Sequence, residues 1–262
     1  MATFAGLFLV MVQKKERMKF AIIAAGEGSR LAKEGVLSPK PLVEVAGKKL
    51  IDRLLGVFHS VGAAALWVVC NDLRPEVAEH LQQIMRHGLD GCQLPLHYIV
   101  RTTPSSMHSF AALAPHLEDG PFVLTTVDTI FRPEEFVRYV EDFSAAIAQG
   151  YDGLMGVTDF IDDERPLYVS VGDGDIITGF YDTYADGLSL ISGGIYGLTP
   201  RALPVLHRCL EHGSSRMRNF QRAMVAEGLR LKAWRFSKVL DIDHATDIAK
   251  AEKFLEGCTP CE

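Results

Sequence analysis

KFAIIAAGEGSRLAKEGVLSPKPL, residues 19–42, is the stretch that decides the fold. Its apolar run FAIIAA carries no charge and ends at a glycine, which predicts a strand buried on both faces, as in the middle of a parallel sheet. Gly26 and Gly28 in the turn that follows lack a Cβ, so backbone N–H groups there can come close to an anion. Arg30 and Lys40 add permanent positive charge. A strand, a glycine turn and two fixed cations together predict a binding site for a triphosphate.

Other glycine-rich phosphate loops fit this stretch less well. The dinucleotide-binding pattern G-x-G-x-x-G requires a third glycine, and Leu31 stands in its place, which disfavours a nicotinamide-dependent dehydrogenase. The P-loop pattern G-x-x-x-x-G-K-[ST] does not occur in the sequence. A strand-to-helix turn without a ligand is the bland alternative. It is disfavoured because Arg30 and the segment Pro39-Lys40-Pro41 follow the turn in order.

Two strings carry a resemblance to a known family: AAGEGSRL at residues 24–31 and SPKPLVEVAGKKLIDRLL at residues 38–55. Together they resemble the signature of the sugar nucleotidyltransferases, also called nucleotide-sugar pyrophosphorylases. That signature is an apolar strand, A-A-G-x-G-[ST]-R-L, a loop and P-K-x-L. The resemblance implies a Rossmann-like nucleotidyltransferase fold with an NTP as one substrate. It also implies that the nucleotide is bound by the residues of the turn, namely Ala24, Ala25, Gly26, Glu27, Gly28 and Ser29.

Size and composition describe a soluble globular protein. The chain has 262 residues, of which 48% are hydrophobic and 23% charged, and its formal net charge is −6. No run of Lys and Arg stands out, so no nucleic-acid surface is indicated. Five cysteines, an odd number, form no disulfide framework. This favours a reducing compartment, and we expect a cytoplasmic protein. The oligomeric state is not readable, and a homo-oligomer stays open.

The first 17 residues stand apart from the rest of the chain. Residues 2–12 are apolar but too short to span a bilayer, and charges follow this run, whereas a secretory signal begins with its charges. We therefore expect residues 1–17 to be a disordered or artefactual extension. Residues 18–257 are expected to form a single nucleotidyltransferase domain, without a membrane partner.

Strands and helices alternate over the first 157 residues. Apolar spacing predicts helices at 50–61, 75–87, 106–117 and 133–149, and apolar runs predict strands at 65–70, 94–100, 121–127 and 151–157. Such alternation predicts an α/β protein with a doubly wound, mostly parallel sheet. Residues 159–198 contain short β-like runs between Gly and Asp turns, which we interpret as a small antiparallel insertion folded over the ligand edge of the sheet. Helices at 200–211, 216–227 and 244–256 and a strand at 230–236 complete the chain.

Acidic residues in two places are candidate metal ligands. Asp128 follows the buried strand FVLTTV as Gly26 follows FAIIAA, so both are expected at the carboxyl edge of a parallel sheet, where ligands bind. An acid there suits a hard cation such as Mg²⁺, although Asp also commonly caps a turn. In the family that the chain resembles, the acid at this strand end is a metal ligand and a late acid shares the metal. Asp241 and Asp243, which point to one face of an extended stretch, both match the late acid.

The resemblance reaches two further segments. RTTPSSMHSFAALAPHL at residues 101–117 resembles the loop and helix that close on the nucleobase, where Ser109 either binds the ligand or caps the helix. ISGGIYGLTPRAL at residues 191–203 resembles the strand that meets the sugar phosphate, with Gly194 permitting a close approach. The Val-Glu-Lys-Pro-like segment of many sugar-1-phosphate enzymes is absent. Arg165 is a candidate substitute, or else a surface charge.

The predicted reaction joins an NTP to a phosphorylated small-molecule acceptor, first of all a sugar 1-phosphate, and releases pyrophosphate. An acceptor phosphate is already anionic at neutral pH, so no general base is needed. We assign the glycine turn and Arg30 to the β- and γ-phosphates, Lys40 to the α-phosphate, and Asp128 with Asp241 or Asp243 to Mg²⁺. Two alternatives stay open. One is a catalytically inactive, nucleotide-sugar-binding regulatory protein, and the other is a cytidylyltransferase acting on an alcohol phosphate such as phosphocholine.

Overall fold

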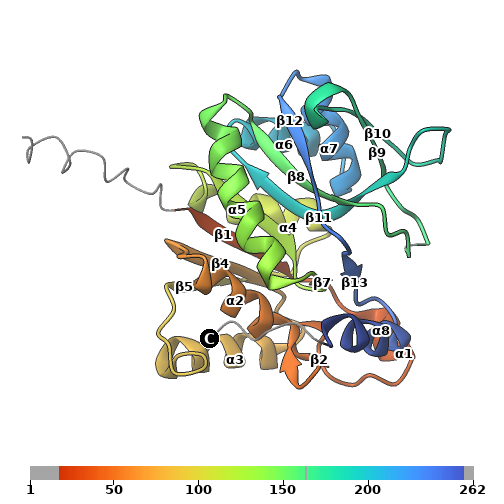
Figure 1. The fold of residues 1–262 in the computed structure, drawn as a ribbon. Helices are drawn as coiled ribbons and strands as arrows, with labels where there is room; N and C mark the ends of the chain where they lie inside the picture. Colours follow the sequence, from red (N-terminus) through yellow and green to blue (C-terminus); the bar gives the residue numbers. More distant parts are fainter. Residues whose placement is uncertain (1–17, 163, 257–262) are drawn as a thin grey trace, which may run out of the picture.

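A computed structural model describes residues 18–162 and 164–256, and the extension expected at residues 1–17 lies outside this part of the chain. One central sheet has helices on both of its faces (Figure 1). The predicted α/β class with a mostly parallel, doubly wound sheet is confirmed. Among the described residues, no helix has the length and apolar character needed to cross a membrane.

The strands of the central sheet are β1 (Lys19–Ala24), β4 (Ala65–Cys70), β5 (Leu96–Val100), β6 (Phe122–Thr126), β8 (Gly153–Thr158), β9 (Tyr168–Val171), β10 (Ile177–Tyr181), β11 (Leu190–Leu198) and β12 (Leu231–Arg235). The α-helices are α1 (Ser29–Lys33), α2 (Leu50–Ser60), α3 (Pro75–His87), α4 (Ser106–Leu113), α5 (Pro133–Ala148), α6 (Ala202–Glu211), α7 (Met217–Ala226) and α8 (Ala245–Leu255). Short strands and 3₁₀ turns complete the fold: β2 (Glu44–Val45), β3 (Lys48–Lys49), β7 (Thr129–Ile130), β13 (Leu240–Asp241), η2 (Lys40–Leu42), η3 (Ala114–His116) and η4 (Asp173–Asp175).

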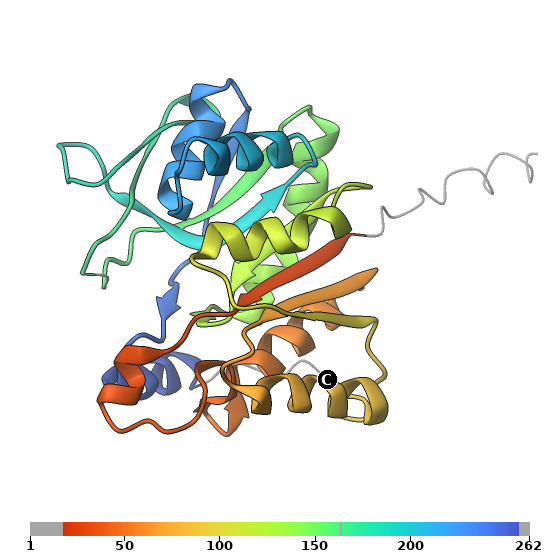
Figure 2. The ribbon, with the colours of Figure 1, turned by 180° about the vertical axis from the view of Figure 1, so that it is seen from behind.

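Strand β1 lies inside the sheet and is buried on both faces. Phe20 and Ile22 belong to one cluster of buried side chains, and Ala21 and Ile23 belong to the cluster on the other face. Successive side chains of a strand point to opposite faces, so both faces require a cover. Helices α2, α3 and α5 cover the first face, and α4, α6 and α7 cover the second (Figures 1 and 2).

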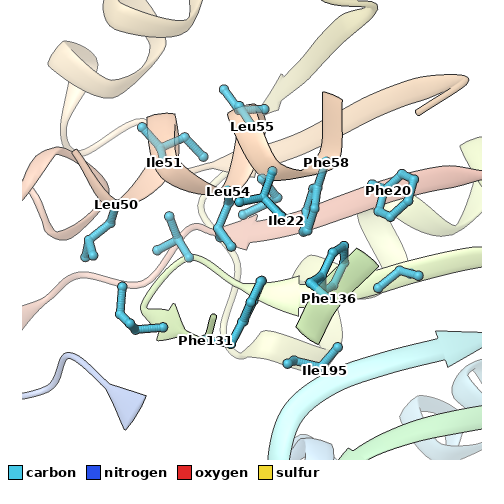
Figure 3. Packing of buried hydrophobic residues seen from close by; sticks show 14 of the residues in the cluster. Phe20, Ile22, Leu50, Ile51, Leu54, Leu55, Phe58, Phe131, Phe136 and Ile195 are labelled. Atoms are coloured by element: carbon cyan, nitrogen blue, oxygen red, sulfur yellow. The ribbon is translucent and has the colours of Figure 1, made fainter. Parts of the chain in front are cut away.

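Aromatic rings fill the first cluster (Figure 3). The ring centroid of Phe136 in α5 lies 5.1 Å from that of Phe58 in α2 and 4.8 Å from that of Phe131. The Phe58 ring in turn lies 4.9 Å from Phe20 in β1. This continuous stack attaches two helices to the strand whose carboxyl end carries the glycine turn.

The strand order reverses at β1. This strand pairs in parallel with β4 on one side and with β6 on the other, and the chain passes through β4 and β5 before it returns to β6. A crevice opens beyond the carboxyl ends of the strands at such a reversal. The register aligns Ile23 with Thr126, so Gly26 and Asp128, which follow the two strands, lie at the same edge.

The antiparallel strands expected over 159–198 are present, and the segment that leads into them lines two hollows at the ligand edge. Strand β11 runs between β6 and β8, antiparallel to both. Its first residues pair with β9 on the edge that β6 occupies further along, so β9 and β10 lie past the carboxyl end of β6. Most residues of β11 are buried. A strand buried in this way requires neighbours on both sides, which places it inside the sheet.

The other predicted helices and strands are present, and most of their bounds differ from the prediction by at most two residues. The helix predicted at 106–117 is the exception, because α4 ends at Leu113 and η3 follows it. Pro115 has no backbone N–H and cannot donate the bond that would continue an α-helix.

Replacement of the central ring of the aromatic stack should destabilise the fold. Phe136 is fully buried, so Phe136→Ala leaves a cavity and is expected to lower the free energy of unfolding by about 3–5 kcal/mol. Val137, the next residue of the same helix, is 36% exposed, and Val137→Ala should change it by less than about 1 kcal/mol. Urea unfolding followed by circular dichroism measures both. Equal midpoints for the two variants would contradict the packing described.

Candidate active site

A pocket of about 430 Å³ opens beyond the carboxyl ends of β1 and β6. Its walls come from the glycine turn, from the turn after β6, from η2 and from the loop before α4. The expected site residues that line it are Ala25, Gly26, Glu27, Gly28, Ser29, Arg30, Lys40, Ser109, Asp128 and Asp243. Ala24 differs from this set, because its side chain belongs to the buried core. Residues from distant parts of the sequence therefore share one pocket.

The ammonium group of Lys40 joins two carboxylates. Its Nζ donates to Oδ2 of Asp128 and, at 2.8 Å, to Oδ1 of Asp243. The side chains of Lys40 and Asp128 are only 12% and 18% exposed. Burial alone would lower the pKa of Lys40, but the two neighbouring carboxylates outweigh burial and raise this pKa above its ordinary value. Lys40 is therefore a fixed positive charge inside the pocket.

Arg30 contacts the same late carboxylate. Its guanidinium donates to Oδ2 of Asp243 at 2.6 Å and is 61% exposed. Burial would raise the pKa of Asp243, but Lys40 and Arg30 lower it below its ordinary value. Asp243 is thus ionised and holds both cations, while the exposed guanidinium keeps donors for a phosphate.

Gly28 brings the glycine turn against η2. It has a φ of +65°, which favours glycine, and a Cβ at this position would lie 3.1 Å from Cβ of Lys40. Pro39 and Pro41 restrict the backbone on either side of Lys40. The close approach of the turn to η2 therefore depends on the missing side chain of Gly28.

A short strand places the late acids beside Asp128. Strand β13 pairs with β7, and the backbone N–H of Ile242 donates to the carbonyl of Asp128 at 3.1 Å. Asp243 then lines the pocket that Asp128 lines, whereas Asp241 lines two adjoining hollows. Lys40 contacts both Asp128 and Asp243, so it is Asp243, and not Asp241, that Lys40 links to Asp128.

The loop before α4 closes the other end of the pocket. Ser105 caps this helix, because its hydroxyl accepts from the backbone N–H of His108 at 3.4 Å. Ser109 is therefore not the cap; it lies buried within the helix, and its hydroxyl is 2.6 Å from that of Thr103. Both hydroxyls lie beside a pocket wide enough for a ligand, so this end is a polar wall suited to a nucleobase.

Asn71 is a residue that the sequence analysis missed. Its buried amide donates to the carbonyl of Ala25 at 3.0 Å and to that of Gly26 at 3.3 Å. It thereby fixes the first peptide groups of the glycine turn. Asn71 directly follows β4, and a polar residue after a buried strand is the same signal that identified Asp128.

Asp128 and Asp243 are the residues that would hold Mg²⁺. Oδ1 of Asp128 is buried and has no hydrogen-bond partner among the described residues. Mg²⁺ at phosphate-handling sites binds one or two carboxylates and takes its other ligands from substrate phosphates and water. The described residues contain no cluster of three or more His, Cys, Asp or Glu suited to a metal. A site with two carboxylates and an orphaned carboxylate oxygen fits this pattern.

A second hollow of about 610 Å³ adjoins the pocket at Thr126 and Asp128. We call it the acceptor-side hollow, and its further lining residues include Arg165, Gly194, Tyr196, Arg216, Arg218, Gln221 and Asp241. Gly194 has a φ of +69° at a bulge, where the register of β11 against β8 shifts. The sequence analysis did not single out Arg216 and Arg218. These two cations lie at the start of a helix, where the helix dipole disfavours positive charge, and this unusual placement is the sequence signal that could have identified them.

Comparisons with known proteins agree with this architecture. A protein assigned as a glucose-1-phosphate thymidylyltransferase from Bacillus anthracis has a solved structure with a TM-score of 0.79 and 16% identity, covering 94% of this chain and 98% of its own. The inositol-1-phosphate CTP transferase of T. maritima gives a TM-score of 0.69 and 19% identity, with coverages of 93% and 98%. At these identities the likeness concerns the fold alone.

Sequence comparison identifies a relative and a family. The CMP-5'-(3-aminopropyl)phosphonate synthase of Streptomyces rubellomurinus is 28% identical over 163 residues, which are 56% of this chain and 25% of that protein. This chain thus spans about a quarter of that relative's length. The MobA-like NTP transferase domain matches residues 20–224. This match spans most of the chain, so the predicted kinship with sugar nucleotidyltransferases is confirmed, and the chain belongs to the MobA-like NTP transferase domain family.

Proposed function

We propose that this chain transfers a nucleoside monophosphate from an NTP to a small acceptor that carries a phosphate or phosphonate group, and releases pyrophosphate. The observation that carries the proposal is the contact of Lys40 with both Asp128 and Asp243 in a pocket lined by the glycine turn. The pocket thus combines two kinds of group that phosphoryl chemistry requires: fixed cations for the phosphates and carboxylates for a hard metal ion.

The proposed step is a substitution at the α-phosphorus. An anionic oxygen of the acceptor forms a bond to this phosphorus, and the bond to the β-phosphate oxygen breaks, so that pyrophosphate leaves with the electron pair. The backbone N–H groups of residues 26–29 and the guanidinium of Arg30 hold the β- and γ-phosphates. Lys40 neutralises charge at the α-phosphate and at the incoming oxygen, which lowers the repulsion between two anions. Bound Mg²⁺ would supply further neutralisation of the triphosphate.

CTP is the nucleotide that we propose first. The relative from Streptomyces rubellomurinus is named for a CMP product, and a glucose-1-phosphate cytidylyltransferase of Salmonella typhimurium is 29% identical over 73 residues. Two acceptor classes are proposed. A sugar 1-phosphate follows from the family resemblance, and an ω-aminoalkylphosphonate is favoured by the longer of these two matches.

A pyrophosphate-release assay tests the proposal. Each of the four NTPs is combined with glucose 1-phosphate, inositol 1-phosphate, phosphocholine and 3-aminopropylphosphonate in the presence of Mg²⁺. We expect release with CTP and at least one of these acceptors. Binding of a nucleotide without release for any pair would instead favour the regulatory, catalytically inactive protein.

Removal of either central charge should stop turnover without unfolding the protein. Lys40→Ala and Asp128→Asn are each expected to lower kcat by about two orders of magnitude, because loss of one electrostatic stabiliser in comparable chemistry costs about 3 kcal/mol. Lys33→Ala, which removes an exposed lysine of α1, should leave kcat unchanged. Steady-state kinetics and urea unfolding check both points. A loss below about threefold would remove the substituted residue from the mechanism.

Magnesium dependence should separate the two late acids. We expect EDTA to abolish turnover and Mg²⁺ to restore it. Asp128→Asn and Asp243→Asn should raise the Mg²⁺ concentration for half-maximal rate by at least about tenfold, equivalent to about 1.4 kcal/mol of binding free energy. Asp241→Asn is the matched comparison and should leave this concentration unchanged at saturating acceptor. A larger effect of Asp241→Asn than of Asp243→Asn would reverse the assignment.

A further inference from the structure

We infer that Arg216 and Arg218, at the start of α7, bind the phosphoryl or phosphonyl group of the acceptor, with Gln221 as a further donor. This inference rests on the proposed function and names the residues that would select the acceptor. The sequence lacks the lysine segment expected for a sugar-1-phosphate enzyme, so the acceptor anion requires another cationic partner. The acceptor-side hollow offers such a partner in Arg216 and Arg218.

The position of the hollow suits an acceptor. It shares Thr126 and Asp128 with the nucleotide pocket, and Asp128 contacts Lys40, which we place at the α-phosphate. Gly194 lines the same hollow at the bulge of β11, where the backbone can be approached closely. An anion bound there would thus be adjacent to the reacting phosphorus.

The two arginines differ in how they are held. Arg218 donates to the carbonyl of Arg165 at 3.0 Å and pairs with Asp182, which also pairs with Arg222 at 2.6 Å. These contacts fix its guanidinium at the hollow. The side chain of Arg216 is exposed and has no hydrogen bond or ion pair within the part of the chain that the structure describes. One arginine is therefore pre-positioned and the other retains all its donors for a ligand.

The start of α7 adds to the attraction for an anion. No side chain caps this helix, which begins with a cation on either side of Met217. A helix N-terminus carries a partial positive charge, so cations in this place repel it, and a bound anion would relieve that repulsion. Guanidinium groups bind phosphate oxygens through paired hydrogen bonds, which matches a doubly charged phosphoryl or phosphonyl group.

Gln221 supplies an independent sign of a ligand. Its side chain is only 2% exposed and lines the hollow. Its carbonyl oxygen accepts from the Ser192 hydroxyl at 2.9 Å, whereas its amide nitrogen has no hydrogen-bond partner among the described residues. This nitrogen therefore keeps its donors for an acceptor oxygen of a ligand in the hollow.

Kinetics with the acceptor that gives turnover test the inference. Arg216→Gln and Arg218→Gln should each raise the KM for the acceptor by about tenfold or more and change the KM for the NTP by less than about twofold. Arg222→Gln is the matched control, because it removes an arginine of the same helix that also pairs with Asp182 but does not line the hollow. It should leave both KM values unchanged. An acceptor KM within about twofold of wild type in both Arg216→Gln and Arg218→Gln would overturn the inference.

Binding of methylphosphonate, followed by ³¹P NMR, tests the anion site without turnover. We expect millimolar binding by the wild-type chain, weakened about tenfold in Arg216→Gln and unchanged in Arg222→Gln. Arg30→Gln distinguishes the two phosphate sites. If Arg30→Gln and not Arg216→Gln removes the binding, or if the wild-type chain does not bind at up to about 50 mM, the inference is overturned. Binding that depends on Arg216 without turnover of any NTP would support the anion site and reject the proposed reaction.

Discussion

The contact of the Lys40 ammonium with the carboxylates of Asp128 and Asp243 is the constraint on which the rest of the site depends. With 12% of its side chain exposed, Lys40 would be costly to bury as an isolated charge, so its partners are needed before any substrate arrives. A triphosphate offers the ammonium a second set of negative oxygens. Exchange of one set of partners for the other requires little movement, and a preorganised charge of this kind favours phosphoryl transfer.

The fold meets this constraint by bringing together the ends of separate elements. Asp128 stands after β6, and the pairing of β13 with β7 carries Asp243 to its side. The first turn of α8 is then fixed: Asp247 accepts from the N–H of His244 at 2.8 Å, and Glu34, directly after α1, accepts from the N–H of Ala245 at 2.7 Å. Because Glu34 directly follows α1, which carries Arg30, these contacts hold the late carboxylate beside its guanidinium partner.

The parts of the site that depend on consecutive residues could be predicted from the sequence. The buried strand, the glycine turn and the acid after FVLTTV each follow from local pattern, and the structure brings Arg30, Lys40 and Asp128 into one pocket. Asn71 gives the same local signal after β4. The place of β11 could not be predicted in this way, because strand pairing joins residues that are far apart in the sequence. The apolar run LISGGIYGL of β11 is a local sign of burial, but it does not identify the neighbouring strands.

The residues of the acceptor-side hollow are distributed along the sequence differently from those of the nucleotide pocket. The glycine turn and Lys40 belong to one stretch of sequence, whereas the acceptor-side hollow takes residues from β6, β11, β13 and α7. Strand β11 lies inside the sheet, and α7 packs on the second face beside it, so the start of α7 can reach the hollow. An absent lysine in one segment therefore says little about the acceptor, since arginines on a different element line the hollow. The order of the strands decides which helix reaches the hollow. The side chains available to an acceptor therefore depend on strand order as well as on local sequence.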